Sequence, residues 1–471
     1  MNKLLIISAI MTSITGCSIN SQIIHKEEEI NFPEKYLVKK EILNESLSYE
    51  EKQNRIKNWW RQFENQELLQ IIEASQKNSP TISAAVLNIK AYENTLLSAK
   101  AKFTPDLNLI SSSSADYYSS SLNSNISVGI KTSWELDILG RKDLLIEVNK
   151  KKIENARANW HEAQTIIAAE AARSYFNYQF CKKSLSILKE DYEARKKQNE
   201  ITHLKVQAGF EAQTSFYQNE AGLSQSQSNI LAQEAQCETE IKSIVALSAI
   251  PEIDIRILLS KEMKHIDKLN LYVPVSIPGD LLNQRPDVLN AVNNLKIAAL
   301  DISKAQLDYY PSVSFSGNIY SSLTNTFGVN STENSWSVGP ISIYLPLFDM
   351  GVRKANEELL FKSYEQSKIE LSTSIRNAVK EIEIALINLS SRNQRSILIN
   401  RSVENYKKAY EATTDTYKVG LSSLFDLEDT RRNYLNELSG QLNNESEKIN
   451  AWINLYKAVG GGFKKIEDKD E

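Results

Sequence analysis

Glycine and proline are scarce in this chain of 471 residues, with 15 and 10 copies. Two stretches lack both residues: 68 positions between Gly140 and Gly209, and 68 positions between Gly351 and Gly420. The second pair of glycines lies 211 positions after the first pair. A stretch without helix breakers that is rich in Ala, Leu, Glu, Lys, Gln and Ile predicts a continuous helix. Such a helix would span roughly 100 Å, so we predict a duplicated chain built to cross a long distance.

A charge imbalance is also missing, because 55 basic and 59 acidic side chains nearly cancel. No basic patch with interleaved aromatic residues occurs, so nothing indicates nucleic-acid binding. Past the N-terminus no apolar run approaches the roughly 18 residues that a membrane-spanning helix needs. The histidines do not cluster, and the chain has no phosphate-binding glycine loop and no nucleophile elbow. We therefore predict neither an enzyme nor a bound metal or cofactor.

Residues 1–16 have the charged start and apolar centre of an export signal. The signal ends in Thr15-Gly16-Cys17, which resembles the lipobox of bacterial lipoproteins. This resemblance implies cleavage before Cys17 and acylation of its thiol and its new amine, since two or more acyl chains give a stable anchor. The alternative is an ordinary export signal with a chance cysteine.

One pair of strands is expected in the first half of the chain. Residues 127–136 alternate apolar and polar side chains over ten positions. Residues 107–118 are a weaker partner, joined through a Ser- and Asn-rich turn at 119–125. A run of about ten alternating residues matches the length of a strand that crosses a membrane at a tilt.

The second half repeats this pattern. Residues 312–319 alternate in the same way, and a strand from 335 to 345 changes parity near Gly339-Pro340, which suggests a bulge. Four strands cannot close a transmembrane barrel, because such barrels begin at about eight, and lipid does not tolerate an open edge. The strands alone leave two alternatives: soluble hairpins packed on the helices, or an oligomer that closes the barrel. The lipid anchor and the internal repeat favour the oligomer.

Cys181 and Cys237 each lie 28 residues from Gly209, one before it and one after it. In an antiparallel helical hairpin that turns at Gly209, the two cysteines sit at the same level. An exported protein meets an oxidising compartment, so we predict a disulfide between them. The alternative is a pair of small buried apolar residues.

Several short motifs follow one another along the chain. They are Trp59-Trp60-x-x-Phe63, Gln284-Arg285-Pro286-Asp287-Val288, Val338-Gly339-Pro340, Leu345-Pro346-Leu347-Phe348-Asp349-x-Gly351 and Tyr417-x-x-Gly420. Their order and the duplication resemble the TolC-like outer-membrane factor family, in particular its acylated branch that serves multidrug efflux. The resemblance covers essentially the whole mature chain. It implies a mainly α-helical fold with a transmembrane β-barrel part: long helical hairpins form a periplasmic α-barrel, and four strands per protomer contribute to a twelve-stranded trimeric barrel.

The resemblance also implies a function and an organisation. The chain would be the outer-membrane channel of a tripartite efflux pump, a passive duct for drugs or other small molecules. Its implied partners are two further copies of itself, a periplasmic adaptor protein, an inner-membrane pump of the RND type and outer-membrane lipid. The alternatives are the exit channel of a protein-secretion system and a periplasmic coiled-coil scaffold without a barrel.

The chain divides into a signal, two repeats and the segments around them. The predicted segments are the signal at 1–16, an N-terminal linker and equatorial segment at 17–60, a first repeat at 61–249 with strands at about 106–136 and a hairpin at 141–249, an equatorial connector at 250–285, a second repeat at 286–459 with strands at about 312–345 and a hairpin at 352–459, and a tail at 460–471.

Asp426 and Asp429 follow the Gly420 turn and lie three positions apart, so they share one helical face. They match the aspartates that line the closed periplasmic entrance in the family. Three copies would bring about six carboxylates together, and their crowding would raise some of the pKa values. A local role is the alternative, because Ser423-x-x-Asp426 resembles a capping box. Tyr417 matches a family residue that helps to tie the tips closed.

Two positions near the turns depart from the family pattern. Ser422 occupies the position of the Arg that usually partners this tyrosine. Ser215 stands in the first repeat where some relatives have a further Asp. Both of these family contacts are therefore left open in this chain.

Overall fold

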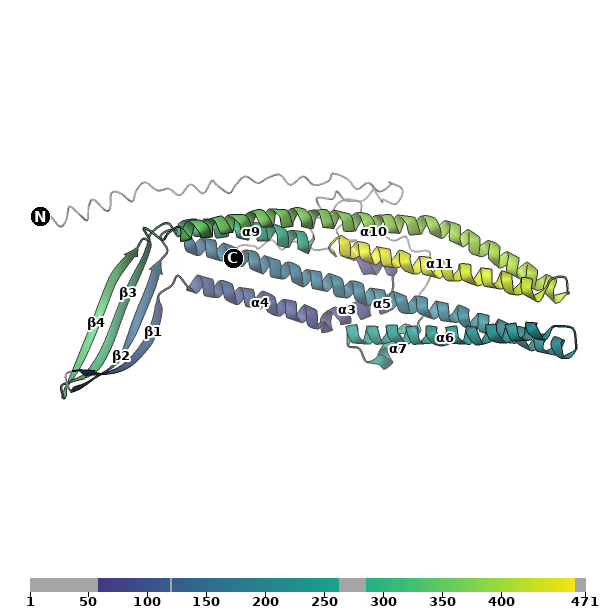
Figure 1. Cartoon of the computed structure of the whole chain (residues 1–471), viewed down its shortest axis with the longest axis horizontal. Coiled ribbons are helices and arrows are strands. Elements are labelled where there is room, and N and C mark those ends of the chain that lie inside the picture. The colour runs from purple at the N-terminus through teal and green to yellow at the C-terminus, as the bar shows by residue number, and fades with distance from the viewer. Residues whose placement is uncertain (1–57, 119–120, 262–284, 462–471) are drawn as a thin grey trace. The chain divides into compact units, whose positions relative to one another are not determined.

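The computed structural model describes residues 58–118, 121–261 and 285–461 (Figure 1). All of them belong to one compact unit, residues 34–471. The predicted export signal, Cys17 and the tail from residue 462 lie outside the described residues. The elements in chain order are η3 (Trp59–Phe63), α3 (Gln66–Asn78), α4 (Pro80–Ala101), β1 (Asp106–Tyr118), β2 (Ser121–Leu136), α5 (Arg141–Gln207), α6 (Gln213–Ser248), α7 (Glu252–Ser260), α9 (Pro286–Leu307), β3 (Ser312–Thr326), β4 (Val329–Tyr344), α10 (Val352–Lys418) and α11 (Leu424–Ala458).

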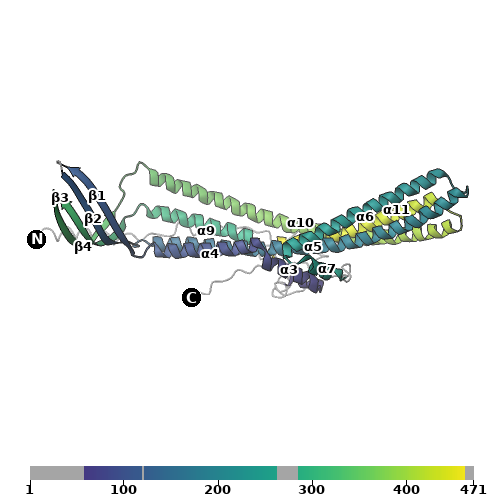
Figure 2. The same cartoon turned by 90° about the horizontal axis from the view of Figure 1, so that it is seen from below.

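The two stretches without Gly and Pro form the two longest helices. Helices α5 and α10 contain 67 residues each, which confirms the predicted pair. Each turns back into a shorter antiparallel helix, α6 or α11 (Figures 1 and 2). The turns place Gly209 at φ +78° and Gly420 at φ +81°, a left-handed conformation that glycine adopts without steric cost. No helix within the described ranges is both long enough and apolar enough to cross a membrane.

Two shorter helices lie beside the long ones. Helices α4 and α9 have 22 residues each and begin at Pro80 and Pro286, because proline suits the first position of a helix. Helix α4 packs on α5, α5 packs on α9, and α9 packs on α10. The lateral order α4–α5–α9–α10 thus follows the chain, and α4 and α10 are the outer helices of this layer.

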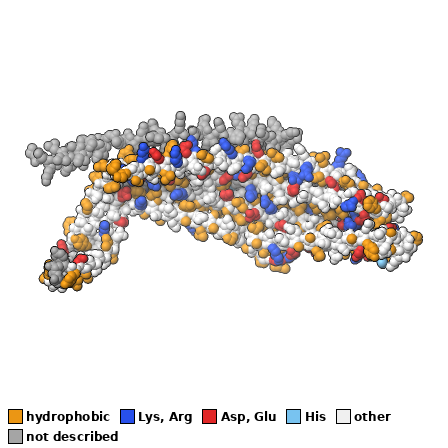
Figure 3. Space-filling view, viewed as in Figure 1, with side chains coloured by type: hydrophobic (Ala, Val, Ile, Leu, Met, Phe, Trp, Pro, Cys, Tyr) orange, Lys and Arg blue, Asp and Glu red, His pale blue; other side chains and the backbone are white. Residues whose placement is uncertain are grey.

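The four strands form one antiparallel sheet in the order β1–β2–β3–β4, with β1 and β4 at its edges. Cross-strand neighbours share a face of the sheet, so the register separates apolar from polar positions. The apolar face carries, as neighbours across the four strands, Leu109, Ile130, Ile319 and Trp336. Ile319 is 65% exposed and Trp336 is 73% exposed, and apolar side chains lie at the surface over the strands in Figure 3. The apolar face of the sheet is therefore uncovered in the single chain.

Two details of the sheet were predicted with different success. The bulge near Gly339-Pro340 is confirmed, because these two residues of β4 stand opposite Ser316 alone. The predicted turn at 119–125 is wrong in length, since Ser121–Asn125 pair with β1 as part of β2. Strand β4 also begins earlier than predicted, at Val329. Pairing with neighbouring strands satisfies the backbone, so Ser- and Asn-rich sequence of low strand propensity is held in the sheet.

Aromatic side chains build the core where the two repeats meet. The rings of Trp59 and Trp452 stack with centroids 4.3 Å apart, and Phe63 packs on Phe176 at 4.7 Å. Trp59 and Trp452 are both fully buried. The predicted boundary at residue 60 falls inside η3, because the whole Trp59–Phe63 motif belongs to this core. The same core contains Ala168, Ala172, Tyr175, Phe176 and Phe180 of α5.

Candidate functional site at the hairpin turns

The second hairpin turn is closed by a capping box at the start of α11. The Asp426 amide donates to Ser423 Oγ at 3.1 Å, and Asp426 Oδ2 accepts from Ser423 N at 3.0 Å and from Ser423 Oγ at 2.6 Å. These hydrogen bonds from Ser423 lower the pKa of Asp426 below its usual value. In the single chain the shift is therefore opposite to the rise predicted for a crowded ring. The capping role of Asp426, given above as the alternative to a gate, is therefore present in the structure.

Asp429 lies one helical turn further along α11. Its carboxylate pairs with Arg432 and accepts a hydrogen bond from Asn433 Nδ2 at 3.2 Å. Its side chain is 39% exposed. Both acids lie in the first turns of α11, where the helix dipole favours negative charge. The turn thus presents two neighbouring carboxylates at one end of the hairpin.

Tyr417 connects the second hairpin to the first. Its hydroxyl accepts from Gln198 Nε2 and from Lys205 Nζ, each at 3.1 Å. The Lys205 ammonium also lies 4.7 Å from the centre of the Tyr417 ring. Ser422, which replaces the family's Arg, bonds instead to Thr416 within its own turn. A tie between the hairpins is present, but its partners come from α5.

The first hairpin turn has a different chemistry. Ser215 donates to Glu211 Oε1 at 2.9 Å and remains within its own turn. What the two turns share is exposed apolar surface: Phe210 is 83% exposed, Leu421 80% and Phe425 76%. The turns therefore combine the Asp426 and Asp429 pair on the second hairpin with uncovered apolar side chains on both.

A cluster of four charged residues lies between the hairpins, farther from the turns. Arg195 on α5 contacts Asp191 at 2.9 Å and Glu428 on α11 at 3.1 Å. Arg431 on α11 contacts Glu428 at 2.6 Å and Asp191 at 3.4 Å. Sequence reasoning missed this cluster, because 233 positions separate Arg195 from Glu428. Only the helical spacing of Asp191 with Arg195, and of Glu428 with Arg431, is visible in the sequence.

Cys181 and Cys237 form a disulfide in the structure, with their Cα atoms 5.6 Å apart. Both cysteines are buried at the level where α5 and α6 leave the core. This is the pairing that the equal spacing from Gly209 predicts. The link joins the two arms of the first hairpin.

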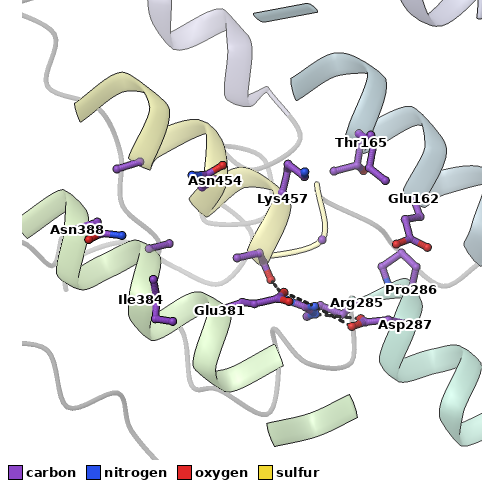
Figure 4. Close-up of a pocket in the computed structure, with 15 residues that line it drawn as sticks. Glu162, Thr165, Arg285, Pro286, Asp287, Glu381, Ile384, Asn388, Asn454 and Lys457 are labelled. Atoms are coloured by element: carbon purple, nitrogen blue, oxygen red, sulfur yellow. Dashed lines mark hydrogen bonds and ion pairs between the residues drawn. The ribbon is translucent and has the colours of Figure 1, made fainter. Parts of the chain in front are cut away.

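A cavity of about 470 Å³ lies between α5, α9, α10 and α11 (Figure 4). The buried Arg285 guanidinium pairs with Asp287 at 2.7 Å and Glu381 at 2.8 Å, and donates to the Ala458 carbonyl at 2.7 Å. Burial first, and then the nearby Asp287 carboxylate, raise the pKa of Glu162 on the cavity wall. The motif arginine thus ties the start of α9 to both arms of the second hairpin. Within the described residues, no group of three or more His, Cys, Asp or Glu side chains could hold a metal ion.

Comparisons with known proteins agree on one family. The chain matches the family of outer membrane efflux proteins over residues 71–249 and 277–461. Nodulation protein T of Rhizobium leguminosarum bv. viciae is 25% identical over 414 residues, which cover 86% of this chain and 84% of that protein. The toluene efflux pump outer membrane protein TtgI of Pseudomonas putida is 23% identical, with 85% of this chain and 86% of that protein covered.

Solved structures show the same fold. The CmeC outer membrane channel of Campylobacter jejuni has a TM-score of 0.78 at 20% identity, with 93% of this chain and 95% of that chain covered. The outer-membrane channel OprN also has a TM-score of 0.78, at 22% identity, with 92% and 98% covered. The predicted fold class is thereby confirmed, and the matching family is one of efflux proteins. This chain belongs to the outer membrane efflux protein family and is an outer-membrane channel component of an efflux pump.

Proposed function

We propose that three copies of this chain assemble into one passive exit duct across the periplasm and the outer membrane. The observation that carries the proposal is that the sheet and the helix layer each have two open edges. In both layers one edge belongs to the first repeat and the other to the second. The sheet ends at β1 and β4, and the helix layer ends at α4 and α10. An open strand edge is not tolerated in lipid, so neighbouring copies must close the sheet. Three copies would supply twelve strands, an even number within the range of known barrels.

The two faces of the sheet suit the two environments of such a barrel. The apolar face carries exposed side chains such as Ile319 and Trp336, which would contact lipid. The opposite face carries Asn108, Lys131 and Asn318 as neighbours in the register, which suits a water-filled lumen. One amphipathic sheet per copy thus matches a channel wall.

The outer helices also leave apolar surface uncovered. On α4, Leu87 and Leu97 are each 66% exposed, and on α10 Leu359 is 67% exposed and Ile369 61%. Large apolar side chains left exposed on both edge helices support an interface between copies. Contact of α4 in one copy with α10 in the next would cover both edges and close an α-barrel in register with the β-barrel.

Asp426 and Asp429 would form the periplasmic gate of this duct. About six carboxylates from three copies would meet where the second hairpins converge. Such a ring attracts cations and narrows the passage. Tyr417 would hold the second hairpin against the first in the closed state through Gln198 and Lys205.

The hairpin turns would dock a periplasmic adaptor, whose complex with an inner-membrane pump of the RND type supplies the energy. Exposed Phe210 and Leu421 support this, because uncovered apolar side chains at both turns offer a binding surface. Acylated Cys17 would anchor the chain to outer-membrane lipid. A passive duct need not recognise its cargo, so drugs or other small molecules would be chosen by the pump.

The test is the assembly and conductance of the full, acylated protein. We expect outer-membrane extracts to yield particles with the mass of three chains, measured by native mass spectrometry. Reconstituted in planar bilayers, these particles should form cation-selective channels. A monomer in the soluble periplasmic fraction would refute the duct and leave the periplasmic scaffold as the better description.

A further inference from the structure

The charged cluster between the hairpins is a closed ring of four side chains, which we call the ionic clasp: Asp191, Arg195, Glu428 and Arg431. Each carboxylate contacts both guanidinium groups, at 2.6–3.4 Å. Two positive and two negative charges make the ring neutral. Half of it comes from α5 of the first hairpin and half from α11 of the second, so the ring can close only while the hairpins lie together.

Two of the four clasp side chains, one of each charge, are buried. Arg431 is 5% exposed and Asp191 9% exposed in their side chains, whereas the pair Glu404–Lys408 on α10 is 65% and 68% exposed. A buried charge depends on its partners, because water cannot replace them. The Arg431 Nε–Asp191 Oδ1 contact is an ion pair without hydrogen-bond alignment. Separation of the hairpins would therefore require water to enter this site.

The first hairpin is shaped to receive the clasp. Ser226 on α6 donates to Asp191 Oδ2 at 3.2 Å. Gly222, one turn earlier on α6, faces Arg195, and a Cβ atom there would lie 3.1 Å from Arg195 Nη1. Glycine inside a helix is unfavourable, and here it leaves room for the guanidinium. The arm α6 thus holds Asp191 and Arg195 of α5 in place.

The clasp lies on the opposite side of α11 from the gate acids. Glu428 and Arg431 are three positions apart, as are Asp426 and Asp429, and the two pairs are offset by two residues. Two residues correspond to about 200° around a helix. The face that holds Glu428 and Arg431 against α5 therefore turns the two aspartates away from α5. Figure 2 shows α5, α6, α10 and α11 side by side along this part of the chain.

We propose that the ionic clasp is the positioning element of the gate. While it is closed, it fixes the rotation and the distance of α11 relative to the first hairpin, and so the place of both gate acids. The gate opens when water replaces the ion pairs between Arg195 and Glu428 and between Asp191 and Arg431. This inference rests on the proposed function of Asp426 and Asp429 as the gate.

The test compares two neutralised pairs with a matched surface pair in the full, acylated protein. The variants are Arg195→Gln with Glu428→Gln, and Asp191→Asn with Arg431→Gln. The matched control is Glu404→Gln with Lys408→Gln, an exposed pair on the same hairpin. Should the more buried pair fail to fold, the Arg195–Glu428 pair, with side chains 22% and 24% exposed, decides the question. Arg195→Lys keeps the charge and should stay close to the parent.

Two measurements separate positioning from plain stabilisation. We expect the open probability in planar bilayers to rise at least about fivefold in the clasp variants, with the control pair unchanged. We also expect faster hydrogen–deuterium exchange in residues 424–435 and not in residues 213–222. A lower melting temperature with unchanged open probability and unchanged local exchange would overturn the proposal.

The gate variant Asp426→Ala with Asp429→Ala distinguishes a failure of the clasp from a failure of the gate. If it raises conductance while the clasp variants do not, the clasp inference is wrong and the gate stands. If the parent forms no channel at all, the proposed function fails. The exchange measurement then still decides whether the clasp holds α11, because it needs no conductance.

Discussion

The long arm of the first hairpin, α5, is buried along most of its length, whereas the long arm of the second, α10, is buried only in its middle. Buried residues of α5 run from Val148 to Thr202, and those of α10 only from Leu371 to Leu389. Both helices have 67 residues. Duplication has thus kept the length of the long arms while their attachments diverged, and the second hairpin is attached mainly through its return arm α11, where Leu427, Arg431 and Trp452 are buried.

The same level of the two hairpins is joined in different ways. In the first, Cys181 and Cys237 form a disulfide. In the second, Arg392 stands 28 residues before Gly420 and pairs with Glu447, 27 residues after it. A covalent link in one arm pair and a surface ion pair in the other suggest that the first hairpin is the fixed wall and the second the moving part.

The largest expected effect comes from loosening the second hairpin from the core. Trp452 is fully buried and packs on Trp59 at 4.3 Å and on Phe63 at 4.9 Å. Trp452→Ala removes a large side chain from a packed site, so we expect a loss of about 3–5 kcal/mol in the free energy of unfolding. Urea unfolding followed by far-ultraviolet circular dichroism measures this loss.

Phe425→Ala is the matched control, an aromatic truncation on the same helix at a site that is 76% exposed. Its unfolding free energy should stay within about 0.5 kcal/mol of the parent. Equal losses for the two variants would show that the core does not hold the second hairpin.

Removal of the covalent link tests the first hairpin. The disulfide closes a separation of 56 residues, and such a link stabilises a protein by about 2–4 kcal/mol. Cys181→Ala with Cys237→Ala should lose this amount in urea unfolding. Arg392→Gln with Glu447→Gln, at the same level of the second hairpin, should lose at most about 1 kcal/mol, because its side chains are 26% and 39% exposed.

Mass mapping of the exported protein without reductant comes before that comparison. It should recover the peptides of Cys181 and Cys237 as a linked pair. Two free thiols in the exported protein would remove the covalent difference between the hairpins.

The next prediction concerns the two acids that distinguish the second hairpin turn from the first. Asp426→Ala with Asp429→Ala removes about six carboxylates from the proposed ring, so single-channel conductance should rise by a factor of about two or more, with weaker cation selectivity. Ser423→Ala is the control, because it removes the capping hydroxyl and leaves both acids in place. That variant should lose about 1 kcal/mol of stability and keep the parent conductance. If both variants change conductance equally, the acids act only through the cap.

Local signals in the sequence predicted the elements of the fold. The absence of Gly and Pro predicts both long helices, and period-two alternation predicts the apolar and polar faces of the sheet. Equal spacing from Gly209 places Cys181 opposite Cys237. The length of the first strand turn was missed, because Ser- and Asn-rich residues are held in β2 by neighbours that local propensity does not contain.

Contacts between the hairpins could not be predicted in the same way. Tyr417 was identified through the resemblance, yet its partners Gln198 and Lys205 lie more than two hundred positions earlier. The ionic clasp was missed for the same reason, since α5 and α11 belong to different repeats and meet only through the packing of the two repeats. A single sequence contains the spacing along each helix but not the relative rotation of two helices, and this rotation decides which charges meet.

The smallest expected effect concerns the cavity between α5, α9, α10 and α11. Glu162 of α5 and Glu381 of α10 line it together with Arg285. Burial, and then the Asp287 carboxylate, raise the pKa of Glu162, so the folded protein keeps this proton at pH values where the unfolded chain has released it. The linked stability is complete below the unfolded pKa and is lost as the pH rises through the folded pKa. Glu162→Gln has no ionisable group at this position, so its stability does not fall in this way as the pH rises.

The melting temperature of Glu162→Gln relative to the parent should therefore increase as the buffer goes from about pH 4 to about pH 7. The gain should stay below about 1 kcal/mol, because the Glu162 side chain is exposed to solvent, which screens its charge. Scanning calorimetry at both pH values measures it, with Glu358→Gln at an exposed site of α10 as the baseline for losing a carboxylate. A difference from the parent that is the same at both pH values, or that matches Glu358→Gln, would mean that Glu162 adds no pH dependence to the joint. In that case the core and Arg285 hold the two hairpins together equally well at either pH.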